Sequence, residues 1–513
     1  MSSFSDQHPA EEPSLNPPAP EEIYSGDAVD VPDELYERII QQVQQICQSV
    51  DEQVTSGKKA TSTTLSADEM PQQPRPPRVP ESLEESGLNL HQLSGLILKL
   101  AYLNGSMNGF EFAKQLRLPF GVVDDGLAFL KAERSLEVSS GELAGRLSYR
   151  FLLTEQGRKR AREAFEECRY VGPAPVSLSD YTQQCREQST RSVPLTADEI
   201  RNAFRKLVVD DALIARLGPA ILSGQSIFLF GTPGNGKTVL AKAIGALMNE
   251  CGGEIYVPYA VSVDRHLITV FDPSLHQTVT TPETTKPEST GLESHFASEP
   301  EFDQRWRKIK RPVVIAGGEL SLDMLDLKYH THSGYYTAPL HLKSNGGVFL
   351  LDDFGRQLVE PSELLNRWIL PLEEQSDFLT LETGKKFSVP FEQLMIFSTN
   401  LSPKDLVDEA FLRRIRHKIP IKAPTEKQFR EIFRLSCEQR GLTYDDWIVT
   451  QLLNKHYNKQ RLPKSSDPRD LLDIVQSICR FREQRFHLSE ELLAEAWQEC
   501  HGGLEICESG EAR

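Results

Sequence analysis

The sequence lacks the features that would place this protein in a membrane or in an oxidising compartment. No stretch approaches the roughly 20 consecutive apolar residues that a membrane-spanning helix needs. The first residues, Met1 to Asp6, carry neither a basic segment nor an apolar core, so no secretory signal is expected. The 8 cysteines form no C-x-x-C pair, which argues against a zinc site or a disulfide framework. We therefore expect a cytoplasmic protein with reduced thiols and no membrane insertion.

The sequence also has fewer basic than acidic residues: 57 Lys and Arg against 74 Asp and Glu, which gives a net charge of −17. Such a chain is not a free-standing polyanion binder, although one basic patch could still contact nucleic acid. The hydrophobic fraction of 39% is low and proline is frequent, with 32 residues. A chain of 513 residues with this composition predicts two or three ordered domains separated by disordered segments.

The first 82 residues are rich in Pro, Ser and Glu, and we predict a disordered tail and a Pro-rich linker there. One short amphipathic helix is expected near 33–50, where Leu35, Ile39, Val43 and Ile46 recur at helical spacing. This helix docks on a partner or a neighbouring subunit, or it packs against its own chain; the pattern fits both.

A compact α+β domain is predicted over 83–170, and a second linker over 171–193. Its order of three helices, a hairpin and a charged helix resembles a winged-helix domain. The third helix would read DNA, but Asp124, Asp125 and Glu133 outnumber its basic residues and would repel phosphate. The residues therefore favour protein docking over DNA binding, and nucleic acid stays possible without being favoured.

The most informative stretch consists of eight residues between a predicted buried strand, 226–230, and a predicted helix that follows it. The stretch matches G-x-x-x-x-G-K-[ST], a loop whose backbone N–H groups point at phosphate oxygens. In this pattern the lysine reaches the β- and γ-phosphates and the threonine hydroxyl binds Mg²⁺. The predicted phosphate-binding residues are Gly231, Thr232, Pro233, Gly234, Asn235, Gly236, Lys237 and Thr238.

Two later strands are predicted to end in polar residues. An apolar run over 346–351 ends in Asp352 and Asp353, and another over 394–399 ends in Asn400. Ligands of open α/β sheets bind where parallel strands end. Asp352 is thus a candidate Mg²⁺ ligand, and Asp353 is a candidate base that polarises the attacking water.

Taken together, these motifs resemble those of AAA+ ATPases. Asn400 resembles the sensor-1 residue of that family, Arg414, or next Arg413, resembles the arginine finger that reaches a neighbouring subunit, and Arg469 resembles the sensor-2 arginine. The resemblance implies an α/β fold: an αβα P-loop core with a parallel sheet over 194–420, and a helical lid over 421–513. It also implies ATP and Mg²⁺ as ligands, with ATP at the subunit interfaces of a ring.

The sequence departs from the family pattern in two places. Most members carry Asp-Glu where this chain has Asp352-Asp353, which makes slow turnover plausible. An insertion is expected near 272–312, with a solvated segment followed by a charged helix over 301–311. The aromatic residues of 320–336 either line a pore-facing loop or pack in the core.

The function that these motifs favour is ATP hydrolysis by a homo-oligomeric ring that remodels a protein client or complex, as a chaperone does. An alternative is a DNA-associated regulator or loader that uses the winged-helix domain and treats ATP as an assembly switch. A third reading, suggested by Asp353 alone, is a nucleotide-gated scaffold without useful hydrolysis.

Overall fold

The computed structural model of the protein describes residues 74–140, 149–279, 300–402, 413–457 and 461–508, with side chains up to 501. The chain divides into two units, Met1–Glu69 and Met70–Arg513. The helix expected near 33–50 and residues 280–299 of the expected insertion lie outside the described residues.

A five-stranded parallel sheet forms the centre of the largest part of the chain. Its strands run in the order β10-β13-β16-β5-β17, and every neighbouring pair is parallel. The strand that leads into the glycine-rich loop, β5, therefore lies between two others. The bounds are β10 Val313–Ala316, β13 Val348–Leu351, β16 Leu394–Thr399, β5 Ile227–Phe230 and β17 His417–Pro420.

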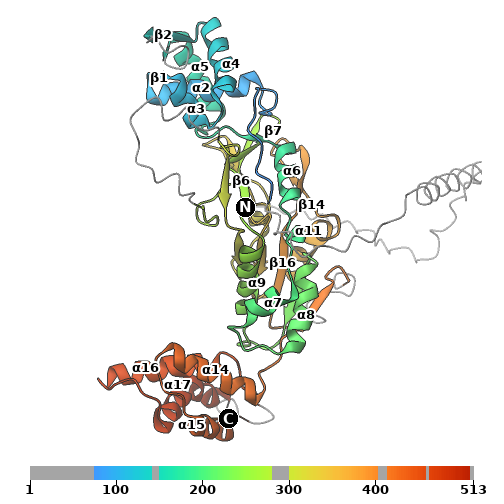
Figure 1. Ribbon diagram of the computed structural model, residues 1–513, viewed down its shortest axis with the longest axis vertical. Helices are drawn as coiled ribbons and strands as arrows, with labels where there is room; N and C mark the ends of the chain where they lie inside the picture. The colour runs from blue at the N-terminus through green and yellow to red at the C-terminus, as the bar shows by residue number, and fades with distance from the viewer. Residues whose placement is uncertain (1–73, 141–148, 280–299, 403–412, 458–460, 509–513) are drawn as a thin grey trace, which may run out of the picture. The chain divides into compact units, whose positions relative to one another are not determined.

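Side chains alternate between the two faces of this sheet, as strand geometry requires. In β5, Ile227 and Leu229 pack with the helices of one face, and Phe228 packs with the other face. The first face is covered by α7 (Ala197–Phe204), α8 (Asp211–Leu222) and α9 (Lys237–Cys251), and the second by α11 (Pro361–Glu374) (Figure 1). The predicted αβα core with a parallel sheet is confirmed.

The strands of a second sheet flank the expected insertion near 272–312: two lie before it and two after it, all between α9 and β13 in the sequence, while the fifth, β4, precedes α9. The order of this sheet is β11-β12-β8-β7-β4, and a separate antiparallel pair joins β6 to β9. Their bounds are β4 Val176–Ser177, β6 Ile255–Pro258, β7 Ala260–Val263, β8 His266–Thr269, β9 Trp306–Ile309, β11 Lys328–His330 and β12 Tyr335–Thr337.

The charged helix predicted over 301–311 is wrong, because Trp306–Ile309 is strand β9. Trp306 is 2% exposed and Ile309 is fully buried, and pairing with β6 outweighs the helical charge pattern. Tyr336 of β12 is also only 2% exposed. It therefore packs in the core, which was one of the two alternatives for the aromatic residues of 320–336.

The elements expected over 83–170 are present: helices, a hairpin and a final helix around one apolar core. They are α2 Leu90–Asn104, β1 Met107–Asn108, α3 Gly109–Leu116, α4 Phe120–Ala132, β2 Leu136–Ser140, β3 Arg150–Leu153 and α5 Glu155–Glu167. The strands pair antiparallel in the order β1-β3-β2. The winged-helix interpretation of this arrangement stays a prediction.

Connecting elements complete the middle of the chain. They are α6 Leu178–Glu187, the 3₁₀ turns Thr190–Ser192 and Leu322–Leu325, the short helix α10 Leu340–Lys343, and the antiparallel pair β14 Ser376–Thr380 and β15 Lys386–Pro390.

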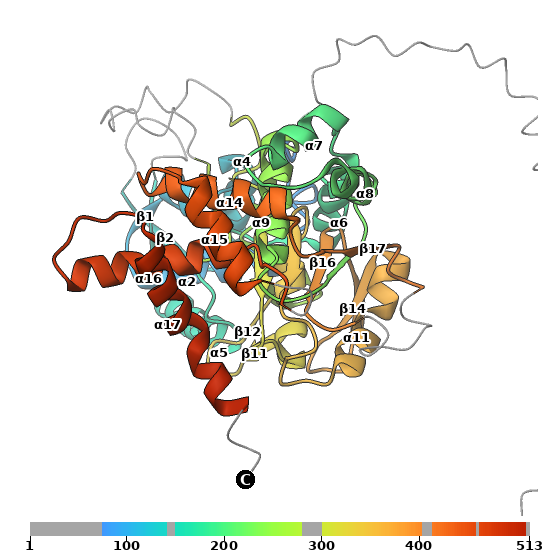
Figure 2. The same ribbon diagram turned by 90° about the horizontal axis from the view of Figure 1, so that it is seen from below.

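After β17 the chain is helical, as expected for a lid. Figure 2 shows α14 (Glu426–Gln439), α15 (Asp446–His456), α16 (Asp467–Phe481) and α17 (Glu490–Glu508). Their apolar faces share a core of their own, in which Phe429, Phe433 and Val449 are fully buried. Amphipathic helices of this length depend on such packing, because they are marginal in isolation.

Candidate nucleotide-binding site

The glycine-rich loop runs from the end of β5 to the start of α9, as the sequence predicts. Gly231 has a φ of 147°, and a Cβ atom there would lie 2.1 Å from the carbonyl oxygen of Ile421. Only glycine fits at this position. The loop delivers the chain to the amino terminus of α9, where backbone N–H groups and the helix dipole favour an anion.

Lys237, the first residue of α9, has its ammonium group turned into the loop. Its Nζ donates to the carbonyl oxygens of Gly231 at 2.9 Å and Thr232 at 3.0 Å, and to Asn400 Oδ1 at 2.7 Å. Burial lowers the pKa of Lys237, while the nearby carboxylates of Asp353 and Asp352 oppose the shift. The ammonium therefore occupies the space between the loop and the strand-end acids, where the phosphates of a triphosphate would lie.

The two candidate Mg²⁺ ligands lie next to each other. Thr238 Oγ1 donates to Asp352 Oδ2 at 2.8 Å. The backbone N–H of Asp352 donates to the carbonyl oxygen of Ala316, which continues the sheet and fixes the aspartate at the strand end. A hydroxyl and a carboxylate are the hard oxygen donors that Mg²⁺ prefers, with phosphate and water in the remaining positions. These residues fit the ion, and the described part of the chain holds no group of three or more His, Cys, Asp or Glu suited to another metal.

Asp353 is aimed at the site by an unusual backbone conformation. Its φ is 49°, in the left-handed region that few residues other than glycine adopt, although aspartate tolerates it. The turn is held against β16, because Phe354 N–H donates to Ser398 O at 2.7 Å and Thr399 Oγ1 donates to Phe354 O at 2.6 Å. The exposed Asp353 carboxylate accepts a hydrogen bond from Asn400 Nδ2 at 2.8 Å.

Gln357 is a site residue that sequence reasoning missed. Its Nε2 donates to the carbonyl oxygens of Asp352 at 3.1 Å and Asp353 at 3.3 Å, and its Oε1 accepts from the N–H of Gly355 at 2.8 Å. The amide therefore braces the turn that carries both acids. No motif marks this glutamine, because its role depends on the path of the loop.

A contact between the loop and the lid was also missed. Ser466 N–H donates to the carbonyl oxygen of Gly234 at 2.9 Å, and Ser465 N–H donates to Asn235 Oδ1 at 3.4 Å. Gly234 has a φ of 82°, and a Cβ atom there would lie 2.8 Å from Ser466 Oγ. The segment that leads into α16 is therefore in direct contact with the phosphate loop.

The candidate arginine finger is not near the loop of its own chain. Arg414 precedes β17, whereas the loop follows β5, and the two strands are parallel, so these groups lie at opposite ends of the sheet. Arg414 Nε pairs with Glu373 Oε1 at 2.6 Å, and its side chain is 28% exposed. Arg413, the second choice, is exposed.

The candidate sensor-2 residue, Arg469, does lie on α16 of the lid. Its guanidinium pairs with the adjacent Asp470 at 2.9 Å, and its side chain is 64% exposed. The loop is contacted instead by the residues before the helix, and the side chain of Lys464 would lie 3.3 Å from a Cβ atom at Gly234. The roles assigned to Arg414 and Arg469 stay predictions.

The positions of the phosphate loop and the polar strand ends define the class of the fold. The phosphate loop, the two acids after β13 and the amide after β16 meet at the carboxyl edge of a five-stranded parallel sheet, and the segment that leads into α16 contacts the loop. This is the αβα arrangement with a P-loop at the edge of a parallel sheet that the motifs predict. Among the described residues, no helix is long and apolar enough to cross a membrane.

Comparison with known proteins gives partial matches. A family described as a domain of unknown function (DUF8689) matches residues 425–499, within the helical lid. No curated protein sequence matches the chain.

Several solved structures are similar in part. A Thermotoga maritima RuvB structure, titled a Holliday junction branch migration motor, is 15% identical with a TM-score of 0.30, over 60% of this chain and 72% of that chain. Brucella abortus NtrX in complex with ADP is 13% identical with a TM-score of 0.33, over 57% of this chain and 56% of that chain. Domain III of the Thermotoga maritima replication initiation protein DnaA is 14% identical with a TM-score of 0.31, over 60% of this chain and 98% of that chain.

Proposed function

We propose that this protein binds ATP with Mg²⁺ at the phosphate loop and hydrolyses it to ADP and phosphate. The observation that carries the proposal is one chain of hydrogen bonds: Lys237 to Asn400, and Asn400 to Asp353. A phosphate-binding cation, a polar amide and a carboxylate base thus meet at one edge of the sheet. Phosphoryl transfer needs mainly such positioned charge, because little covalent chemistry is left to the protein.

Each residue has a distinct part in this reaction. Gly231 to Thr238 hold the phosphate oxygens, with the Lys237 ammonium at the β- and γ-phosphates. Thr238 and Asp352 would hold Mg²⁺, which neutralises charge on the phosphates when bound. Asp353 accepts a proton from the attacking water, and Asn400 keeps that carboxylate and the water in line.

A second copy of the chain completes the site in this proposal. Arg414 of one subunit reaches the γ-phosphate held by its neighbour, an effect that can be worth ~10³–10⁵ in rate. It first has to leave Glu373, but an ion pair that is partly open to solvent contributes only about 0–1 kcal/mol. Arg469 couples the bound nucleotide to the position of the lid. The ring uses ATP hydrolysis to remodel a protein client, and the 83–170 domain binds that client.

The test is ATP hydrolysis by the full-length protein across a range of concentrations. Lys237→Ala and Asp353→Ala each lower the rate at least about 100-fold, as loss of a group that stabilises transition-state charge commonly does. Lys242→Ala is the matched control, because Lys242 is an exposed lysine on the same helix. Equal rates in all four proteins contradict hydrolysis at this site, and a rate per subunit that ignores concentration contradicts the shared site.

The alternative function is a DNA-associated regulator or loader that uses the 83–170 domain, with ATP as an assembly switch. The exposed face of α4 carries Asp125 and Lys131 and has few side chains that could donate hydrogen bonds to DNA bases. Exposed basic residues gather instead on α5, at Arg158, Lys159 and Arg162. Binding of the full chain to duplex DNA that weakens steeply with salt, and that the triple alanine variant of these residues loses, supports this alternative. No binding at low salt rules it out.

A further inference from the structure

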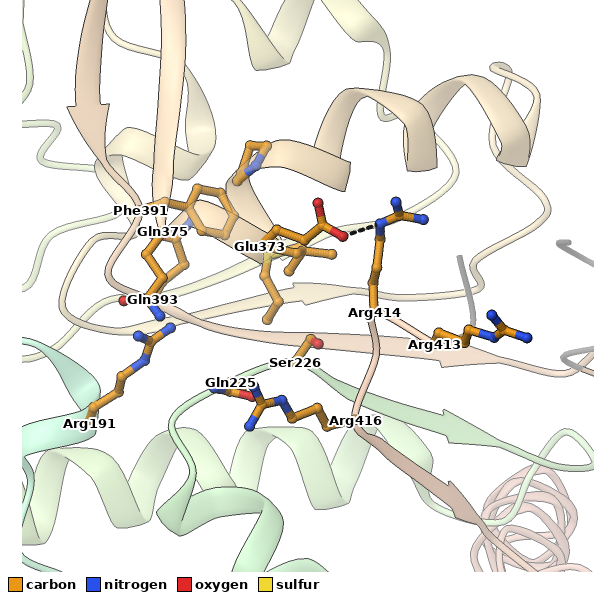
Figure 3. Close-up of a pocket in the computed structure, with 13 residues that line it drawn as sticks. Arg191, Gln225, Ser226, Glu373, Gln375, Phe391, Gln393, Arg413, Arg414 and Arg416 are labelled. Carbon is orange, nitrogen blue, oxygen red and sulfur yellow. Dashed lines mark hydrogen bonds and ion pairs between the residues drawn. The ribbon is translucent and has the colours of Figure 1, made fainter. Parts of the chain in front are cut away.

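A pocket of about 470 Å³ opens at the end of the sheet opposite the phosphate loop (Figure 3). Gln225 and Ser226 precede β5, Gln393 precedes β16, and Arg416 precedes β17. Because these strands are parallel, the pocket collects residues from their amino ends, while the predicted nucleotide site uses their carboxyl ends. The pocket and the predicted nucleotide site therefore lie at opposite edges of the sheet.

The lining of this pocket is strongly basic in a chain of net charge −17. Four arginines line it, namely Arg191, Arg413, Arg414 and Arg416, against the single acid Glu373. Glu373 is already paired with Arg414. Among the described residues, neither Arg191 nor Arg416 forms an ion pair, so both guanidinium groups contribute positive charge to the pocket.

The charges around Arg191 also indicate an excess of positive charge in the pocket. Burial lowers the pKa of Arg191, the carboxylate of Glu392 opposes the shift, and Arg416 adds to it. The two guanidinium groups are therefore close enough to repel each other. Glu392 also accepts a hydrogen bond from Ser189 Oγ at 2.7 Å, so its charge is shared with a second partner. An anion between the two arginines would remove the repulsion.

Gln393 gives an independent indication that a ligand belongs here. The residue is 4% exposed, and neither its Nε2 nor its Oε1 has a hydrogen-bond partner in the described structure. A buried amide left unpaired destabilises the fold, because it has lost its hydrogen bonds to water without gaining others. Figure 3 shows that the side chains of Gln393 and Arg191 point toward one another. A ligand oxygen at this place would pair the amide N–H.

We propose that this pocket is a second phosphoryl-binding site, in which Arg191 and Arg416 neutralise the anion and Gln393 donates to one of its oxygens. Two guanidinium groups balance a dianion and present planar forks that match phosphate oxygens. The phosphoryl group comes from free phosphate or nucleotide, or from nucleotide bound at the phosphate loop of another copy. The second source rests on the proposed function, whereas the first does not.

The experiment begins with full-length Lys237→Ala protein, in which the phosphate loop no longer holds a nucleotide, at a concentration where light scattering reports monomer. Titration calorimetry with inorganic phosphate and with ADP gives one site per chain if the ligand is free in solution. Adding Arg191→Ala or Arg416→Ala weakens that binding at least about 10-fold, the scale of one charged hydrogen bond. Arg201→Ala, an exposed arginine on α7, is the matched control and changes nothing.

Gln393→Leu separates binding from folding. Removing an unpaired buried amide leaves the midpoint of thermal unfolding unchanged or raises it, and yet phosphate binding weakens. If monomeric Lys237→Ala protein binds neither probe, ADP is titrated into concentrated wild-type protein. A loss of ADP affinity in Arg191→Ala and Arg416→Ala that appears only in the assembled protein assigns the phosphoryl group to a second copy. No effect of either substitution in both settings overturns the proposal, whereas wild-type and Lys237→Ala proteins that bind the same number of ADP molecules per chain contradict the proposed function alone.

Discussion

Asn400 Nδ2 donates a hydrogen bond of 2.8 Å to Asp353 Oδ1. The oxygen of the same amide accepts from Lys237 Nζ at 2.7 Å. One side chain at the end of β16 therefore joins the cation of the phosphate loop to the acid at the end of β13. The direction of the amide is fixed by these two partners, because a flipped amide would face a donor with N–H and an acceptor with oxygen.

Asn400→Ala should separate binding from chemistry. We expect hydrolysis to fall about 10–100-fold, because the Asp353 carboxylate loses the donor that orients it, while nucleotide affinity changes little. Single-turnover hydrolysis and calorimetric binding of ADP measure the two effects. Asn104→Ala, at an exposed asparagine of α2, is the control. A loss of affinity as large as the loss of rate would show that Asn400 acts in binding.

Asp353 carries both a chemical and a conformational requirement, and two substitutions separate them. Asparagine also tolerates a φ of 49°, so Asp353→Asn should keep the free energy of unfolding within about 0.5 kcal/mol and abolish hydrolysis. Asp353→Val should abolish hydrolysis and also cost about 1–3 kcal/mol, because a β-branched residue is strained there. Urea unfolding and phosphate release measure the two properties. Equal stability of the two variants would show that the turn relaxes.

Local patterns predicted much of this site. The loop, Asp352, Asp353 and Asn400 are each recognisable because an apolar strand fixes where the next polar residue lies. Sequence patterns do not fix where a long side chain points. Arg469 lies on the expected helix, but its guanidinium pairs with Asp470. The strand at Trp306 was mistaken for a helix because its partner, β6, lies about 50 residues earlier and local charge gives no sign of it.

The contact between Gly234 and Ser466 illustrates the same limit and can be tested with a matched pair. Gly234→Ala forces a Cβ atom to within 2.8 Å of Ser466 Oγ, whereas Gly384 has the same φ of 82° and nothing within 4 Å. Gly384→Ala should cost only the backbone strain, about 1 kcal/mol. Gly234→Ala should cost more and should speed hydrogen exchange at the Ser466 amide. Equal exchange in the two variants would show that the lid segment does not depend on this contact.

Stability should fall at acid pH through Asp377, a buried carboxylate of β14. Its Oδ1 accepts from Arg367 Nη1 at 2.6 Å, and its side chain is 3% exposed. Burial would raise the pKa of Asp377, but His341 and Arg367 outweigh burial and lower the pKa to about 2. A carboxylate with a lowered folded-state pKa stabilises the fold above its unfolded pKa, so about 2 kcal/mol should be lost as the pH falls from about 4 to 2.

Asp377→Asn should remove this pH dependence and cost about 3 kcal/mol at neutral pH, because Arg367 keeps only the more exposed Asp326 as an ionic partner among the described residues. Urea unfolding of wild type and variant at pH 7, 4 and 2.5 measures both effects. Asp198→Asn is the control, since its pair with Arg201 is exposed and contributes little. A wild-type curve that is flat between pH 4 and 2.5, or one that the Asp377 variant reproduces, would place the acid sensitivity elsewhere in the chain.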